Sequence, residues 1–246
     1  MRYAKEKGID IIICDHHTPD EILPDAIAVL DPKRVDSTYP YPHLSGCGVG
    51  FKLIQAFAIN NHIDFDNITP FLDLLAVSIA SDIVPITGEN RILMFFGLKQ
   101  LNANPCVGLQ AIIDVCGLRG KEITTSDIVF KIGPRINASG RMRSGNEAVE
   151  LLVSKNLSFA KAKSDCIDQY NQERKDLDKK TTDDAKDFIQ GNEDFEHRNS
   201  IVVYHPEWSK GVIGIVASRL SELYHKPTIL LTLSNGFATG SARSVT

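Results

Sequence analysis

The sequence lacks the features that mark membrane, secreted and metal-thiolate proteins. None of its apolar runs approaches the roughly 20 residues that a membrane-spanning helix needs, and residues 1–7 are charged instead of opening an apolar leader. The five cysteines are scattered and form no CxxC pair, so we expect reduced thiols, neither a zinc site nor a disulfide framework. These absences predict a cytoplasmic protein that makes no membrane contact.

The chain also lacks an excess of positive charge. Its 27 lysines and arginines are outnumbered by 31 aspartates and glutamates, so the formal net charge is −4. Any contact with nucleic acid would therefore need a local basic patch. The composition, 43% hydrophobic and 24% charged, is otherwise ordinary for a globular protein. A length of 246 residues suffices for one large domain or two smaller ones.

The stretch Asp15-His16-His17 stands out because it follows an apolar run at residues 9–14. That run predicts a buried strand of a parallel sheet, and ligands of open α/β sheets bind where strands end. Side chains alternate along extended backbone, so one histidine could bind a metal while its neighbour faces a ligand. Asp15 could ligate the metal or orient a ring. A polar loop after a strand is the equally weighted alternative.

The pattern of apolar and helix-breaking residues predicts both strands and helices. A first helix ends at Gly8, and a helix at residues 69–81 is apolar on nearly all sides, so we expect it to be buried. Residues 145–190 predict one broken helix or two consecutive helices that could bridge two domains. We expect strands at residues 9–14, 26–30, 200–204, 228–233 and 237–245, further helices at residues 51–58, 88–101, 109–115 and 215–223, a proline-rich loop at residues 31–45 and a linker at residues 191–199.

Two local features carry weaker hypotheses. The glycine-rich residues 46–50 precede a helix and could cradle a phosphate, although close packing of the helix start is the favoured interpretation. Asp82 ends the apolar helix, where a carboxylate is costly unless it is paired or bound to a cation. A helix-capping or turn aspartate is the somewhat favoured alternative for Asp82.

Residues 131–143 hold four cations and no acid. Their glycine, proline, asparagine and serine content predicts a loop. Arginine offers a planar fork for two phosphate oxygens, and a solvated basic loop is the equally weighted alternative. The small residues around Arg243 would likewise let a phosphate approach the backbone. The cations of the first segment are Lys131, Arg135, Arg141 and Arg143.

Several motifs together resemble the DHH phosphoesterase superfamily, and within it the exonucleases that degrade single-stranded DNA from 5′ to 3′. They occur in the order of that family and cover nearly the whole chain. The motifs are Asp15-His16-His17-Thr18-Pro19, Ala80-Ser81-Asp82-Ile83-Val84-Pro85, Gly133-Pro134-Arg135-Ile136-Asn137-Ala138-Ser139-Gly140-Arg141, Gly211-Val212-Ile213-Gly214-Ile215-Val216-Ala217-Ser218-Arg219 and Gly240-Ser241-Ala242-Arg243-Ser244.

The resemblance implies an α/β fold in three parts. Residues 1–144 would be the C-terminal part of a DHH domain, with a parallel sheet flanked by helices. Residues 145–190 would be a long connecting helix. Residues 191–246 would begin a second α/β domain of the DHHA1 type, and a narrow groove between the domains would admit one strand of DNA.

The resemblance also implies roles for individual residues. Asp15, His16, His17 and Asp82 would be catalytic, with His16, Asp82 and Asp15 holding Mn²⁺ or Mg²⁺ in a two-metal site and His17 facing the scissile phosphate. The substrate would be single-stranded DNA in repair and recombination. We expect a monomer, with a single-strand-binding protein or a helicase as cellular partners. The phosphate-binding residues would be Arg135, Asn137, Arg141, Arg143, Arg219, Ser241 and Arg243.

One departure from the family pattern concerns the metal site. The family carries further aspartate ligands before the Asp-His-His motif, and Asp10, within the predicted strand, is the only aspartate that precedes it here. We therefore expect a chain truncated at both ends, with an incomplete metal site and no activity alone. A DHH phosphodiesterase acting on oligoribonucleotides or cyclic dinucleotides is one alternative, which the basic segment disfavours. A non-catalytic nucleic-acid-binding relative is the other, which the intact motif disfavours.

Overall fold

The computed structural model describes residues 1–245, except for the side chains of Glu193 and Glu196. Contacts divide the chain into two compact units. Unit 1 comprises residues 1–134 and 152–161, and unit 2 comprises residues 135–151 and 162 onward. No helix within residues 1–245 combines the length and the apolarity that a bilayer crossing requires. The division into three domains that the resemblance implies stays a prediction.

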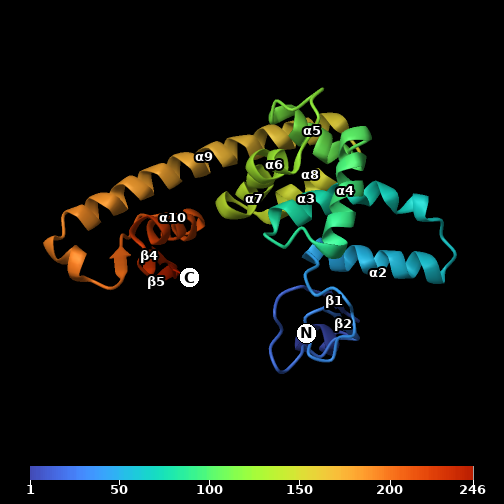
Figure 1. The fold of residues 1–246 in the computed structure, drawn as a ribbon, viewed down its shortest axis with the longest axis horizontal. Helices are drawn as coiled ribbons and strands as arrows, with labels where there is room; N and C mark the ends of the chain where they lie inside the picture. Colours follow the sequence, from blue (N-terminus) through green and yellow to red (C-terminus); the bar gives the residue numbers. More distant parts are fainter. Residues whose placement is uncertain (246) are drawn as a thin grey trace. The chain divides into compact units, whose positions relative to one another are not determined.

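Helices dominate unit 1, and one small sheet accompanies them (Figure 1). Three helices, α7 (Gly133–Met142), α8 (Gly145–Val153) and α9 (Leu157–Gln190), contribute residues to both units. The elements of unit 1 are α1 (Arg2–Glu6), β1 (Ile12–Cys14), β2 (Ala28–Leu30), α2 (Gly46–Asn60), the 3₁₀ turns η1 (Phe65–Asn67) and η2 (Thr69–Phe71), α3 (Leu72–Ser81), α4 (Gly88–Ala103), α5 (Val107–Val115), α6 (Thr125–Asp127) and the π-helix η3 (Ile128–Ile132).

The two strands of unit 1 are parallel, as predicted. Ile12 lies opposite Ala28, and Cys14 lies opposite Leu30. The prediction of a buried strand is wrong, because the side chain of Ile12 is 53% exposed and Ile9 before it is 58% exposed. The physical reason is the small sheet. In the described residues β1 has β2 as its one strand neighbour, and two strands cannot cover their own faces.

The centre of unit 1 is α3, which is buried as its all-round apolarity predicts. Its buried residues are Leu72, Asp73, Leu75, Ala76, Val77, Ile79 and Ala80. The neighbouring α4 approaches α3 closely at Gly97. A Cβ on Gly97 would lie 2.4 Å from the carbonyl oxygen of Leu72 and 2.7 Å from the Cβ of Ala76. Glycine therefore sets how closely these two helices can pack.

Asp73 is a buried carboxylate on α3. It accepts hydrogen bonds from the backbone N–H groups of Cys106, at 2.7 Å, and Leu74. Burial raises the pKa of Asp73 above its usual value, although these N–H donors oppose the shift. Since Cys106 is the residue before α5, this carboxylate links the start of α3 to the start of α5.

The prediction of a loop at residues 131–143 is wrong, because these residues lie almost entirely in η3 and α7. The helical run starts at a capping box in which Thr124 and Asp127 bond each other's backbone N–H groups. The π-helix η3 ends two residues before Pro134, whose nitrogen cannot donate a hydrogen bond. Packing overrides the loop-like composition, since Ala138 and Ser139 are fully buried.

Unit 2 contains a mixed sheet covered by a helix. Its elements are η4 (Glu193–His197), β3 (Ile201–Tyr204), α10 (Lys210–Tyr224), β4 (Thr228–Ser234) and β5 (Phe237–Arg243), in addition to α7 to α9. β3 pairs with β4 in parallel, and β4 pairs with β5 antiparallel, with Leu230 opposite Ser241. The core joins the end of α9 to α10 and the sheet through Ala185, Ile189, Ile201, Trp208, Ile213, Val216, Ala217, Leu220 and Leu230.

Two consecutive helices occupy the region predicted at residues 145–190. α8 ends at Val153, and α9 then runs for 34 residues without interruption (Figure 1). The predicted linker at residues 191–199 contains the 3₁₀ turn η4. The strands and the helix predicted after it are confirmed as β3, α10, β4 and β5.

We predict that Gly97→Ala lowers the free energy of unfolding by about 1–3 kcal/mol, because the added methyl group overpacks the contact between α3 and α4. Chemical denaturation measures this change. Gly50→Ala in α2 is the matched control, since a Cβ there meets nothing within 4 Å. Alanine should stabilise that helix by about 0.5–1 kcal/mol. Equal effects of the two substitutions would contradict the packing argument.

We predict that Thr124→Ala destabilises the helical run by about 1 kcal/mol near pH 7. The bonds to Lys131 and Thr124 lower the pKa of Asp127 to about 2, against about 3.9 when unfolded. The ionised carboxylate therefore stabilises the fold above about pH 4, and this contribution is lost as the pH falls toward 2. Urea unfolding near pH 7 and near pH 3 should show a smaller deficit at the lower pH. Ser126→Ala, which removes a neighbouring exposed hydroxyl, should change little at either pH.

Candidate functional site

His16 and Asp82 meet although they lie far apart in the sequence. His16 follows β1, and Asp82 is the C-terminal cap of α3. His16 Nε2 lies 3.2 Å from Asp82 Oδ2. The same carboxylate oxygen accepts the backbone N–H of Gly46, the first residue of α2, at 3.3 Å. Three segments of unit 1 therefore converge on one carboxylate group.

The surroundings of this pair are unusual in two respects. The side chain of His16 is only 11% exposed, and its Nδ1 is buried without a hydrogen-bond partner in the described part of the chain. Ile83, directly after Asp82, has φ +53° and is 98% exposed. A β-branched residue in this conformation is strained, and such strain clusters at functional sites.

Asp15 and His17 form a second pair beside the first. Asp15 Oδ1 lies 2.7 Å from His17 Nδ1 and accepts the backbone N–H of His16, also at 2.7 Å. These bonds, that to the His17 side chain above all, lower the pKa of Asp15. An ionised carboxylate can only accept, so Nδ1 of His17 carries a proton. Nε2 of His17 is then available to another partner, because the His17 side chain is 77% exposed.

The side chains of this site fit part of a metal-binding sphere. Two neighbouring ligands held about 2.1 Å from one octahedral ion lie about 3 Å apart, which agrees with the 3.2 Å between His16 Nε2 and Asp82 Oδ2. An imidazole nitrogen with a carboxylate oxygen suits Mn²⁺. No group of three or more histidine, cysteine, aspartate or glutamate side chains that could hold a metal occurs in residues 1–245. Asp15, the third predicted ligand, bonds His17 and the backbone instead.

The predicted phosphate-binding side chains in and just after α7 differ in their availability. Arg135 donates from Nε to Asp168 Oδ1 at 2.7 Å, and its side chain is only 16% exposed. Arg141 is exposed and donates to the carbonyl oxygen of Gly211 at 3.3 Å, and Asn137 is exposed. Arg143, the residue after α7, lies over the ring of Tyr170 at 5.4 Å and pairs with Glu173 at 3.6 Å, with 53% of its side chain exposed. Arg135 is therefore held by a carboxylate away from solvent, whereas the other three side chains are exposed.

Arg219 is directed at α9 and not at β5. Its Nη1 and Nη2 atoms donate to the two carboxylate oxygens of Asp178 at 2.7 and 2.9 Å, and Nη1 also donates to Thr182. The bond to Asp178 raises the pKa of Arg219. This two-bond pair joins α10 to α9, so the structure gives Arg219 a packing role where the resemblance implies a phosphate contact.

Ser241 and Arg243 lie together on β5, and α10 packs against them. Arg243 Nη1 donates to Ser241 Oγ at 2.8 Å and to the carbonyl oxygen of Ala242 at 2.7 Å. Arg243 Nε donates to Ser218 Oγ on α10 at 3.0 Å. Beside them lies Gly214, where a Cβ would come within 3.1 Å of Ser241 Oγ. This cluster of small residues around an exposed guanidinium suits an anion such as phosphate.

The glycine-rich residues 46–50 begin α2, and Gly46 and Gly48 pack closely against their neighbours. Ser45 caps this helix by accepting the N–H of Gly48 at 3.1 Å. A Cβ on Gly46 would lie 3.4 Å from Cδ2 of His16. The first N–H of the helix is used by Asp82, so Gly46 and Gly48 support close packing of the site and not a separate phosphate cradle.

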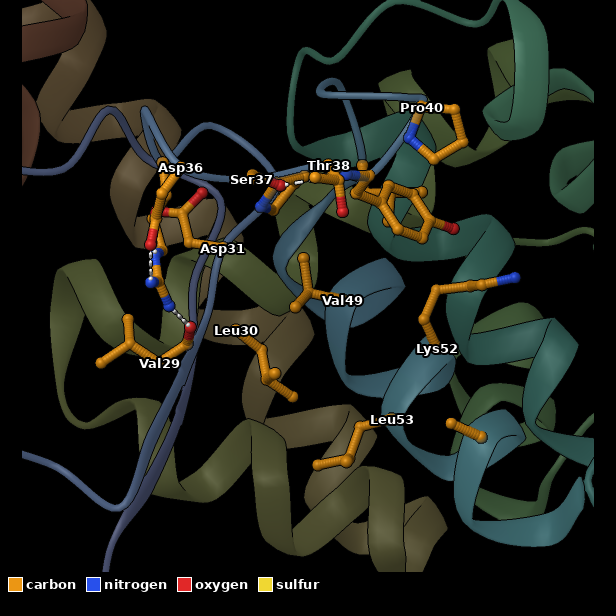
Figure 2. Close-up of a pocket in the computed structure, with 15 residues that line it drawn as sticks. Val29, Leu30, Asp31, Asp36, Ser37, Thr38, Pro40, Val49, Lys52 and Leu53 are labelled. Atoms are coloured by element: carbon orange, nitrogen blue, oxygen red, sulfur yellow. Dashed lines mark hydrogen bonds and ion pairs between the residues drawn. The ribbon is translucent and has the colours of Figure 1, made fainter. Parts of the chain in front are cut away.

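A pocket of about 530 Å³ lies between β2, the loop after it and α2. Figure 2 shows Leu30, Val49 and Leu53 on one side of it and Asp36 on the other. Arg34, which also lines it, bonds both carboxylate oxygens of Asp36 at 2.9 and 2.6 Å. None of the residues predicted for catalysis or phosphate binding lines this pocket.

Sequence reasoning missed two contributions to these sites. It assigned no role to Ser218 or Gly214, which flank Arg243. Their spacing in the sequence could have indicated this role, because Gly211, Gly214 and Ser218 lie on one face of a helix. The backbone N–H that Gly46 offers to Asp82 had no signal in the sequence, since it depends on where α2 begins.

Comparisons with known proteins agree with this geometry. Residues 1–79 match the N-terminal domain of the DHH family. The chain is 35% identical over 258 aligned residues to the single-stranded-DNA-specific exonuclease RecJ of Salmonella typhimurium, covering 100% of this chain and 45% of that protein. It is 37% identical over 256 residues to the protein of the same name from Haemophilus influenzae, covering 100% of this chain and 44% of that protein.

The fold matches a solved structure equally well. The crystal structure of RecJ in complex with Mn²⁺ from Thermus thermophilus superimposes with a TM-score of 0.83 at 29% identity, covering 99% of this chain and 35% of that chain. The chain thus spans somewhat less than half the length of the curated relatives reported above. The α/β architecture that the motifs imply is confirmed. The chain is a homologue of RecJ, and its residues 1–79 match the N-terminal domain of the DHH family.

Proposed function

We propose that this chain forms part of a metal-dependent phosphodiesterase that removes nucleotides from the 5′ end of single-stranded DNA. The observation that carries the proposal is the approach of His16 Nε2 to Asp82 Oδ2 at 3.2 Å, beside the Asp15–His17 pair. A second support comes from relatives that are named single-stranded-DNA-specific exonucleases. Unit 1 supplies metal ligands, and unit 2 supplies a phosphate-binding cluster.

His16 and Asp82 would hold a divalent ion, Mn²⁺ or Mg²⁺, and groups other than these two side chains would supply the remaining ligands. When bound, such an ion polarises the phosphate and lowers the pKa of a coordinated water. The N–H of Gly46 holds Asp82 Oδ2 toward His16. Asp15 holds His17 Nδ1, so that His17 Nε2 can face an oxygen of the scissile phosphate.

Ser241 and Arg243 would bind the phosphate at the 5′ end of the strand, because they combine a hydroxyl with an exposed guanidinium. The exposed side chains of Asn137 and Arg141 on α7, and of Arg143 directly after it, would contact phosphates further along the strand. Arg135 and Arg219 are left out of this role, since Asp168 and Asp178 already hold their guanidinium groups. Contacts of this kind track the backbone without reading bases.

The cellular setting follows from the same proposal. Single-stranded DNA with a free 5′ end arises in DNA repair and recombination, which we infer to be the processes served, in the cytoplasm. A monomer would suffice for this reaction. A helicase or a single-strand-binding protein would be its partner, because each handles the single strand that is the substrate.

We predict that this chain alone binds Mn²⁺ weakly, because His16 and Asp82 provide only two side-chain ligands. His16→Ala and Asp82→Asn should each weaken that affinity further, by at least about tenfold. Electron paramagnetic resonance of free Mn²⁺ during a titration measures the affinity. His43→Ala, which removes an exposed histidine of unit 1, is the control and should bind as the unaltered chain does.

Two outcomes would contradict this prediction. Equal losses in His16→Ala and His43→Ala would show that the ion binds elsewhere. Tight stoichiometric binding with hydrolysis of single-stranded DNA by this chain alone would contradict the incomplete ligand set.

We predict that Arg243→Ala removes the preference for a 5′-phosphorylated oligonucleotide over its 5′-hydroxyl counterpart. The loss should be about tenfold or more in relative affinity, since a charge-assisted contact to phosphate disappears. Fluorescence anisotropy with the two thymidine oligomers in EDTA measures both affinities without hydrolysis. Arg198→Ala removes the same charge from the end of the turn before β3. It should weaken the binding of both oligomers by the same factor. An unchanged ratio in Arg243→Ala would refute the phosphate role.

A further inference from the structure

The guanidinium of Arg243 uses three of its five N–H donors inside unit 2. Nη1 donates to Ser241 Oγ and to the carbonyl oxygen of Ala242, and Nε donates to Ser218 Oγ. Neither N–H of Nη2 has a partner among the described residues. Hydrogen bonds therefore hold the guanidinium plane along its Nε edge and its Nη1 edge. The two N–H groups of Nη2 form the free edge of this exposed side chain.

The hydroxyl of Ser218 holds the Nε edge of Arg243 in place. It lies 3.2 Å from the carbonyl oxygen of Gly214, one helical turn earlier. A carbonyl oxygen can only accept, so Ser218 donates its hydrogen there. Its oxygen is then turned to accept from Arg243 Nε, which can only donate. The α10 backbone thus orients Ser218, and Ser218 orients Arg243.

Gly214 leaves space beside the free donors. A Cβ at this residue would lie 3.3 Å from Arg243 Nη2 and 3.1 Å from Ser241 Oγ. The Ser241 oxygen accepts from Arg243, so its own hydrogen is available to a ligand. Two N–H groups of Nη2 and one hydroxyl therefore border a space that any side chain at residue 214 would narrow. Three donors around one gap match the oxygens of a terminal phosphate.

We propose that Ser218 is a positioning residue that holds the Arg243 guanidinium, and that Gly214 keeps its free edge open, so that together they set the preference for a 5′-terminal phosphate. The proposal rests on the proposed role of Ser241 and Arg243 and deepens it. Ser218 touches Arg243 and not the ligand, so its effect passes through the guanidinium.

Ser218→Ala tests the proposal in the same chain. We expect the ratio of affinities for the 5′-phosphorylated and 5′-hydroxyl thymidine oligomers to fall by about two- to tenfold. Binding of the 5′-hydroxyl oligomer should stay unchanged. Ser218→Thr keeps the hydroxyl and should restore the ratio. Thermal unfolding should be unaffected in Ser218→Ala, because alanine is the better helix former.

Gly214→Ala provides an independent measurement. The added methyl group should lower the same ratio by crowding Nη2 and the Ser241 hydroxyl, while the helix keeps its stability. This inference alone would be overturned if the ratio of affinities is unchanged in both Ser218→Ala and Gly214→Ala while Arg243→Ala removes the preference for the 5′-phosphorylated oligomer. A ratio that Arg243→Ala leaves intact would overturn the phosphate role and this inference with it. Loss of stability in Ser218→Ala with an unchanged ratio would make Ser218 merely structural.

Discussion

Burial of α3 on all sides is the constraint on which unit 1 depends. A helix that is apolar on nearly all sides is buried, and close packing around it holds its two ends in place. Close packing against α4 is possible because residue 97 is glycine. At one end Asp73 reaches the start of α5, and at the other end Asp82 reaches His16 and the first N–H of α2. The packing of α3 thereby positions the carboxylate of Asp82 beside His16.

Two buried polar groups of unit 1 differ in how they are satisfied. Asp73 is buried yet satisfied by backbone N–H groups, as expected of a residue that joins helices. His16 is buried with Nδ1 unsatisfied, and the strained Ile83 follows its partner Asp82. Such costs persist where the surrounding fold imposes them, and here they adjoin the pair proposed to hold metal.

Three arginines of unit 2 differ in their partners. Arg135 and Arg219 bond carboxylates on α9, so their charge is neutralised locally and they hold helices together. Arg243 has hydroxyl and carbonyl acceptors, which orient its guanidinium without cancelling its charge. A phosphate-binding arginine needs this second arrangement, because its positive charge has to remain available to the ligand.

The sequence by itself determined the order and type of most elements, because apolar periodicity, glycine and proline act locally. It also singled out Asp15, His16, His17 and Asp82 through a resemblance that the comparisons bear out at the level of the family. Only the tertiary structure decided that residues 133–142 form a helix, since burial of Ala138 and Ser139 outweighs their loop-like composition. It alone also assigned partners to Arg135 and Arg219 and brought Ser218 to Arg243, because hydrogen bonds between distant segments depend on packing that no local pattern records.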